Sequence, residues 1–169
     1  MKNIVFLIIV LLMSSALYSQ IKVENTTYKF QIDYSKGWNA GSKVETDKKD
    51  VINYSFTKSD KMTSSIIAFR FTVQTNIDDL IYKLEKDFSL NIPEKTNGYK
   101  NLSGEVYEGK QADYKDSETI EKIYYYTTTK DSAGEFFCYM IRFIADGKYN
   151  KTNFDTEVSN IAGTFKIKL

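Results

Sequence analysis

The strongest constraint on the fold is a pair of long, strand-like segments in the second half of the chain. Residues 119–129 read TIEKIYYYTTT and residues 135–145 read EFFCYMIRFIA. β-Branched and aromatic residues dominate both segments, as is typical of strands. The loop KDSAG between them contains Asp, Ser and Gly, which favour turns. The sequence therefore predicts a long β-hairpin in this region.

Alternation of apolar and polar residues predicts more strands before and after this hairpin. Tyr28, Phe30 and Ile32 alternate with polar residues ahead of a turn at Gly37, in the stretch YKFQIDYSKGWN. Other strand-like segments lie at about residues 38–46, 51–57, 64–75, 102–108, 110–114 and, as a short tail, 164–169. The segments 102–108 and 110–114 are predicted to be separate, divided near Gly109.

Two segments change to the helical period. In residues 76–90, apolar residues recur with the spacing of one helical face at Ile77, Leu80, Ile81, Leu84 and Phe88. Asn76 is suited to be the N-cap, and Asp78 and Asp79 suit the positive end of the helix dipole. A second helix is predicted from about residue 151 to residue 162, with Gly163 at its end.

The order of these elements predicts an α+β fold. We expect an antiparallel sheet of about six to seven strands flanked by two amphipathic helices. No repeat, low-complexity segment or linker interrupts the chain, so residues 20–169 are predicted to form a single domain.

The first 19 residues resemble a signal peptide. Lys2 precedes the uninterrupted apolar run 4–13, and small residues follow that run. Cleavage after Ala16 and cleavage after Ser19 both fit the pattern. A retained N-terminal anchor is the alternative, but a bilayer-spanning helix needs about 20 apolar residues. We therefore expect an exported protein, periplasmic or extracellular, with no stable membrane insertion once the leader is removed.

Composition narrows the chemistry. Without Lys2 the chain carries 22 basic and 22 acidic residues, which argues against nucleic acid as a partner. There is no histidine, so the usual general base and the commonest zinc ligand are missing. Cys138 is the single cysteine and is expected to be a buried small hydrophobe rather than a reactive thiol. No metal, cofactor or catalytic residue is predicted, and we expect the protein not to be an enzyme.

Three parts of the sequence together resemble one known family. They are the strand and turn leading to tryptophan (YKFQIDYSKGW), the aromatic strand with its loop (FFCYMIRFIADGKYN), and the final helix with its tail (FDTEVSNIAGTFKI). This combination resembles the PsbP/DcrB/LpqN-like domain. The resemblance implies an α-β-α sandwich in a small, exported, non-catalytic protein. It transfers no functional residue, because the chain displays no site motif of the family.

Three aromatic residues are candidates for contact with a ligand or partner. Trp38 is the only tryptophan; its ring could stack on a ligand, but the amphipathic strand before it favours core packing. Tyr124 and Tyr126 lie two residues apart and so face the same side of their strand. They could form a flat platform for carbohydrate or a protein partner, or pack against a second layer.

The only two arginines, Arg70 and Arg142, lie within the apolar segments AFRFT and MIRFI. We expect both guanidinium groups on the less apolar side of the sheet. One hypothesis is that they approach each other and bind a carboxylate or phosphate. The alternative is internal salt bridges with strand acids such as Glu121.

The resulting expectation is a non-enzymatic interaction module of the cell envelope, whose partner is another envelope or extracellular protein. The alternative is a carrier or sensor that holds a small apolar or anionic ligand between sheet and helix.

Overall fold

The computed structural model describes residues 20–59, 61–87 and 89–169. The predicted signal peptide, residues 1–19, and the predicted helix-face residue Phe88 lie outside the described residues. The described elements are, in chain order, β1 (Ile21–Asn25), β2 (Phe30–Tyr34), β3 (Asn39–Glu45), β4 (Val51–Lys58), β5 (Met62–Phe71), α2 (Ile77–Lys86), β6 (Lys100–Ser103), β7 (Tyr107–Lys115), β8 (Thr119–Thr128), β9 (Phe136–Asp146), α3 (Lys151–Ala162) and β10 (Lys166–Ile167).

Seven strands form one antiparallel sheet in the order β3-β4-β5-β9-β8-β7-β6. The predicted hairpin β8–β9 lies inside this sheet, and most residues of both strands are buried. Burial on both faces explains why apolar and aromatic residues follow one another in these two strands without strict alternation. The hairpin therefore forms the centre of the fold.

The strand around Phe30 does not join this sheet. β2 pairs with β1 on one side and with the C-terminal β10 on the other, in a separate three-stranded sheet. The predicted sheet of about six to seven strands is present, but the sequence analysis did not predict this second sheet. The physical reason is that Phe30, Ile32 and Tyr34 are all fully buried against the large sheet, so β2 packs across it face to face.

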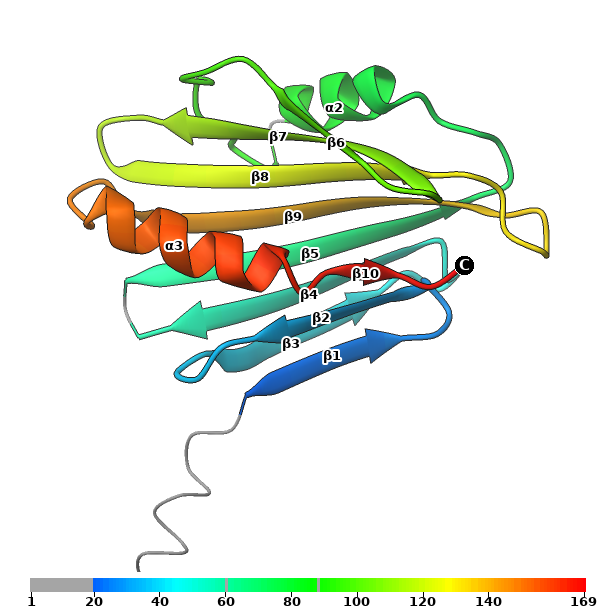
Figure 1. Ribbon diagram of the computed structural model, residues 1–169, viewed down its shortest axis with the longest axis horizontal. Coiled ribbons are helices and arrows are strands. Elements are labelled where there is room, and N and C mark those ends of the chain that lie inside the picture. The colour runs from blue at the N-terminus through cyan, green and yellow to red at the C-terminus, as the bar shows by residue number, and fades with distance from the viewer. Residues whose placement is uncertain (1–19, 60, 88) are drawn as a thin grey trace, which may run out of the picture.

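The large sheet separates two apolar cores. Figure 1 shows α3 and the three-stranded sheet on its near side, with α2 at the end formed by β6 and β7. The first core contains the α3 residues Phe154, Val158 and Ile161 and the buried residues of β2. The second contains the apolar face of α2 above β7, β8 and β9. One helix on each face makes an α-β-α sandwich, and the predicted α+β fold class is confirmed.

Both helices begin where their sequences predict. The side chain of Asn76 accepts a hydrogen bond from the backbone N–H of Asp78 and caps α2. The side chain of Asn150 accepts one from the backbone N–H of Asn153 and caps α3. The bounds of α3 match the predicted range of 151–162.

Gly109 does not divide a strand, contrary to expectation. β7 runs through it without a break, and Gly109 pairs with Tyr126 of β8. A Cβ atom at this position would lie 2.7 Å from the carbonyl oxygen of Tyr125. The glycine therefore permits close approach of two strands rather than a turn.

None of the described helices has both the length and the apolar character needed to cross a membrane.

Candidate functional site

Trp38 is part of the first core. It is 3% exposed, and its ring lies 5.2 Å from that of Tyr34 in an edge-on arrangement. The indole N–H donates a hydrogen bond of 2.9 Å to Oε1 of Glu157 on α3. The structure thus places Trp38 where core packing requires it, and its face is not open to a ligand.

The Trp38 hydrogen bond belongs to a small group of contacts that joins α3 to the sheet. Glu157 Oε1 also accepts from the Ser35 hydroxyl and forms an ion pair of 2.7 Å with Lys58. Burial on its own raises the pKa of Glu157, but these three partners outweigh burial and hold the pKa below its ordinary value. The hydroxyl of Ser35, the indole N–H of Trp38 and the ammonium of Lys58 therefore all hold α3 against the sheet through Glu157.

Tyr124 and Tyr126 share one face of β8, as predicted, but they are covered. Tyr124 is 9% exposed and Tyr126 is 6% exposed. The Tyr126 ring packs 4.9 Å from Phe165, in the segment between α3 and β10, and the Tyr124 ring meets Phe143 edge-on. The hypothesis of a flat exposed platform is wrong, because the C-terminal part of the chain forms the layer that buries both rings.

The two arginines lie on opposite faces of the sheet. In the β5–β9 register Arg70 is opposite Phe137, which belongs to the first core, whereas Arg142 is opposite Ser65 on the α2 side. A single anion site formed by both guanidinium groups is therefore excluded by the strand register. The expectation that both guanidinium groups point to the same, less apolar side of the sheet is also wrong. Positions along a strand alternate between faces, and the register places Arg70 and Arg142 on different ones.

Each arginine is used in an internal contact instead. Arg142 is bound by both carboxylate oxygens of Glu121, at 2.7 Å each, and also donates to the carbonyls of Leu90 and Asn91. Burial raises the pKa of Glu121 even though Arg142 acts to lower it. Arg70 lies 3.6 Å from the carboxylate of Glu135. These ion pairs are those that the alternative interpretation expected.

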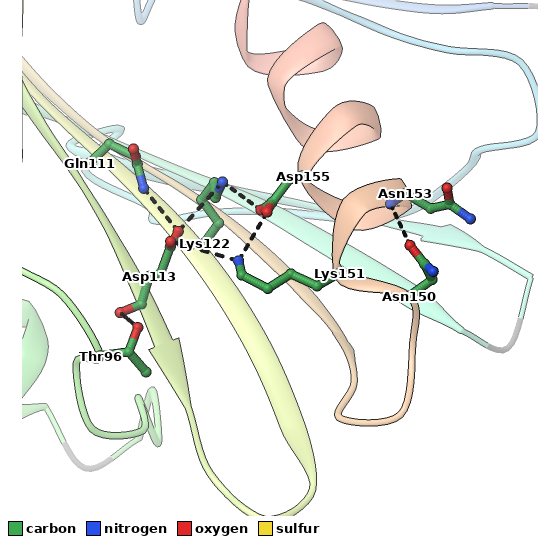
Figure 2. A network of polar contacts seen from close by, with 8 residues as sticks. All are labelled: Thr96, Gln111, Asp113, Lys122, Asn150, Lys151, Asn153 and Asp155. Carbon is green, nitrogen blue, oxygen red and sulfur yellow. Dashed lines mark hydrogen bonds and ion pairs between the residues drawn. The ribbon is translucent and has the colours of Figure 1, made fainter.

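A polar network that the sequence analysis did not predict lies on the α3 side of the sheet (Figure 2). Lys122 Nζ is 2.7 Å from Asp155 of α3 and 3.5 Å from Asp113 of β7. Lys151 contacts the same two aspartates at 2.9 Å and 3.9 Å. Two lysines and two aspartates balance each other, so the network connects α3 to the sheet without leaving a net charge.

One sequence signal could have pointed to this network. Lys122 occupies the strand face that otherwise carries Ile120, Tyr124 and Tyr126, which are buried residues. A lysine in that position must find an acid or reach solvent. The partners Asp113 and Asp155 are far apart in sequence, and the α3 packing that brings them together is not visible in either local pattern.

A cavity of about 340 Å³ opens beside this network. Its volume lies within the range of small-molecule sites, which begins at about 300 Å³. The cavity walls are mixed in character and include Asp113, Tyr114, Glu121, Tyr149, Lys151 and Phe154. Asp113 and Glu121 do not converge, because each is bound to a different cation and they project from opposite faces of the sheet.

The described part of the chain contains no group of three or more His, Cys, Asp or Glu side chains that could hold a metal ion. Cys138, 1% exposed, lies in the second core, and burial raises the pKa of its thiol to about 12. A thiol in that environment stays protonated and is shielded from reagents.

A part of the large sheet that no described helix covers lies on the α2 side of β4 and β5. The helix α2 packs mainly against β7 and β8, so it covers only one half of its side of the sheet. We call the uncovered part the open sheet face. It consists of nine residues: Val51, Asn53, Ser55, Thr57, Thr63, Ser65, Ile67, Phe69 and Phe71.

The open sheet face has an apolar side and a polar side. Ile67, Phe69 and Phe71 are half-buried against the second core, and the rings of Phe69 and Phe71 stack with centroids 5.9 Å apart. Asn53 and Thr63, farther from α2, are exposed. A partly exposed aromatic pair bordered by short polar side chains is the composition typical of a protein-binding surface.

Comparison with known proteins supports the fold. No protein-family model matches the chain, and no curated protein matches it significantly. The solution structure of cyanobacterial PsbP (CyanoP) from Synechocystis sp. PCC 6803 aligns with a TM-score of 0.57 at 15% identity, over 88% of this chain and 92% of that one. The crystal structure of LpqN, described as involved in cell envelope biogenesis of Mycobacterium tuberculosis, aligns with a TM-score of 0.54 at 12% identity, over 90% and 92% of the two chains. Identities this low establish the fold alone.

Proposed function

We propose that this chain, whose domain has the PsbP/LpqN-like fold, is an exported, non-enzymatic interaction module of the cell envelope. The observation that carries the proposal is the open sheet face. Half of one side of a large sheet has no helix packed on it, and it exposes part of the stacked Phe69–Phe71 pair. Its partner is another envelope or extracellular protein.

The rigidity of the surface supports recognition of a protein. β5 pairs with β4 over residues 62–69 and with β9 over residues 62–71, so most of its backbone is fixed by both neighbours. The side chains of the open sheet face therefore keep constant spacing, and binding costs little conformational entropy. Half-buried aromatic rings in such a setting supply apolar contact area with few freely rotating bonds.

The assignment to the envelope rests on two supports. The N-terminal residues 1–19 have the pattern of a signal peptide. LpqN, which shares the fold, is described as involved in cell envelope biogenesis in its own organism. The first support favours export, and the second favours a role connected with the cell envelope.

The non-enzymatic part of the proposal is supported by the state of the reactive groups. The chain has no histidine, and the thiol of Cys138 is buried with a raised pKa. The carboxylates beside the cavity are held in ion pairs with Lys122, Lys151 and Arg142. A general acid and base pair needs two groups aimed at one reacting bond, and this arrangement does not provide one.

The test is affinity capture from an envelope extract with Asn53→Arg and Asn53→Glu. Asn53 is exposed on the open sheet face beside Ile67, so either charge places a solvated group against the apolar contact area. The matched control is Asn160→Arg, an exposed position on α3. We expect one specific partner to be lost from both Asn53 variants and kept by the control. Retention by all three variants contradicts the proposal.

A second function, a carrier or sensor of a small ligand, is favoured by the 340 Å³ cavity between the sheet and α3. The mixed wall, with Phe154 and Tyr149 beside Lys151, suits a small molecule that has an apolar body and an anionic group. Native mass spectrometry of the protein purified from its host separates the two functions. A retained small mass supports the carrier, and a clean apo mass supports protein recognition.

A further inference from the structure

β3 is one of the two edge strands of the large sheet, and all seven of its residues are exposed. Its inner side pairs with β4, and its outer side faces away from the sheet (Figure 1). An exposed edge strand offers a row of backbone N–H and C=O groups to another strand. Val44, at 63% exposed, is among the most exposed large apolar residues in the described part of the chain.

The hydrogen bonds of β3 identify which backbone groups point outward. The N–H of Thr46 donates to the carbonyl of Val51 at 3.0 Å, so Thr46 and Val51 form a hydrogen-bonded pair of the β3–β4 ladder. Such pairs alternate along an antiparallel ladder. The backbone N–H and C=O of Val44 therefore also point toward β4. Those of Lys43 and Glu45 point to the open edge.

This pattern restricts how two copies of β3 could pair around a two-fold axis. A residue that points outward must meet another that points outward, so the axis has to pass through a residue of the strand. The register of β3 is regular over Lys43, Val44 and Glu45, beyond the irregularity between Ala40 and Lys43, so we consider these three centres. The first sets Lys43 opposite itself and the last sets Glu45 opposite itself, and like charges directly opposite are destabilising. The register centred on Val44 sets Lys43 opposite Glu45 of the other copy, twice.

Both charges are available for this pairing. Within the described residues neither Lys43 nor Glu45 forms an ion pair, and Lys43 Nζ only lies over the ring of Tyr54 at 5.7 Å. The edge strand β1 carries the same Lys-Val-Glu order at residues 22–24, but Glu24 is already paired with Lys22 and Lys168. Glu45 interacts with the Tyr28 hydroxyl, but the β3 charges lack the ionic partners that the β1 charges have.

We propose that β3 binds β3 of a second copy in an antiparallel arrangement centred on Val44. The backbone groups of Lys43 and Glu45 form the new ladder, the two Val44 side chains meet at the axis, and two Lys43–Glu45 pairs fix the register. The contact is isologous and closes after two subunits. Because the axis is perpendicular to the sheet, both open sheet faces lie on the same side of one continuous sheet.

The test is sedimentation equilibrium of the full mature chain over a range of concentrations. Lys43→Glu and Glu45→Lys each replace two attractive pairs with two repulsive ones, so we expect each to weaken dimerisation about tenfold or more. The exchanged variant Lys43→Glu/Glu45→Lys restores both pairs and is expected to dimerise within about threefold of the native chain. The control Lys100→Glu, on the opposite edge strand β6, is expected to leave dimerisation unchanged.

Mixing the two single variants makes the test specific. In a mixed dimer each altered residue meets the unlike charge of the other variant, so the equimolar mixture is expected to dimerise more tightly than either variant alone. Circular dichroism of each variant checks that it is folded. A monomeric native chain, failure of the mixture to associate, or assemblies larger than a dimer each overturn the proposal. Larger assemblies would indicate head-to-tail pairing of β3 with β1.

Discussion

Removal of the buried cation Arg142 tests the interpretation of its ion pair as structural. Arg142 is 9% exposed and Glu121 is 3% exposed, and the two are joined by two hydrogen bonds of 2.7 Å. Arg142→Met keeps a similar side-chain length but leaves a carboxylate buried without its cation. Breaking a buried ion pair in this way costs about 3–5 kcal/mol of the free energy of unfolding.

The double variant Glu121→Met/Arg142→Met separates the cost of the unpaired charge from the value of the pair itself. It removes both charges, so most of the lost stability is expected to return. What remains is the loss of donors to the carbonyls of Leu90 and Asn91, about 1 kcal/mol for each. The double variant is therefore expected within about 2 kcal/mol of the native chain.

The pH dependence gives the loss a second signature. Burial already raises the pKa of Glu121 against the effect of Arg142, and removal of Arg142 raises that pKa further. A carboxyl whose pKa is raised in the folded state favours folding below its ordinary pKa and loses that contribution as the pH rises. The stability deficit of Arg142→Met is therefore expected to be larger at pH 7 than at pH 5.

Urea unfolding followed by tryptophan fluorescence is a suitable assay, because Trp38 is the only tryptophan and is buried in the first core. Equal deficits of Arg142→Met at pH 5 and pH 7, together with no recovery in the double variant, would refute the reasoning. That outcome would mean that water reaches Glu121 freely and that the pair contributes only through packing.

Three further predictions concern other parts of the fold. Cys138 is expected to resist thiol reagents in the folded protein and to react after unfolding, since burial raises its pKa to about 12; reaction at native conditions contradicts its place in the core. Gly109→Ala is expected to lower the free energy of unfolding by about 1–3 kcal/mol, because its Cβ would lie 2.7 Å from the carbonyl oxygen of Tyr125. Thermal unfolding measures the loss. Gly98→Ala is the neutral control, because a Cβ at residue 98 would meet no atom within 4 Å beyond its own chain neighbours. Asp155→Asn is expected to cost about 1 kcal/mol at pH 7 in urea unfolding. Burial works to raise the pKa of Asp155, but two lysines lower it overall, so the difference from the native chain should shrink as the pH falls through the acidic range; a constant difference contradicts this.

Local periodicity was sufficient for the helices. The spacing of apolar residues at Ile77, Leu80, Ile81 and Leu84 predicted the face of α2, and these four residues are buried. Asn76 and Gly163 lie at the predicted ends of their helices. Both kinds of signal act within one or two helical turns, so no information from distant parts of the chain was needed.

The candidate site residues were less predictable, because their surroundings come from distant segments. The alternation of β8 placed Tyr124 and Tyr126 on one face, but it could not show that Phe165, about 40 residues away, covers that face. Arg70 and Arg142 look alike in sequence, each between apolar neighbours. Only the pairing of β5 with β9 shows that they occupy opposite faces.

The sequence by itself determined the class of the fold, the identity of most strands and both helices, and the lack of histidine chemistry. These properties depend on the order of residues within short segments and on composition. Tertiary structure alone decided that β2 leaves the large sheet to pair with β1 and β10, and which part of the α2 side stays open. Strand partners and the layers that cover a face are set by packing among segments far apart in the chain, since the free energy of burying apolar surface depends on total area and not on sequence distance.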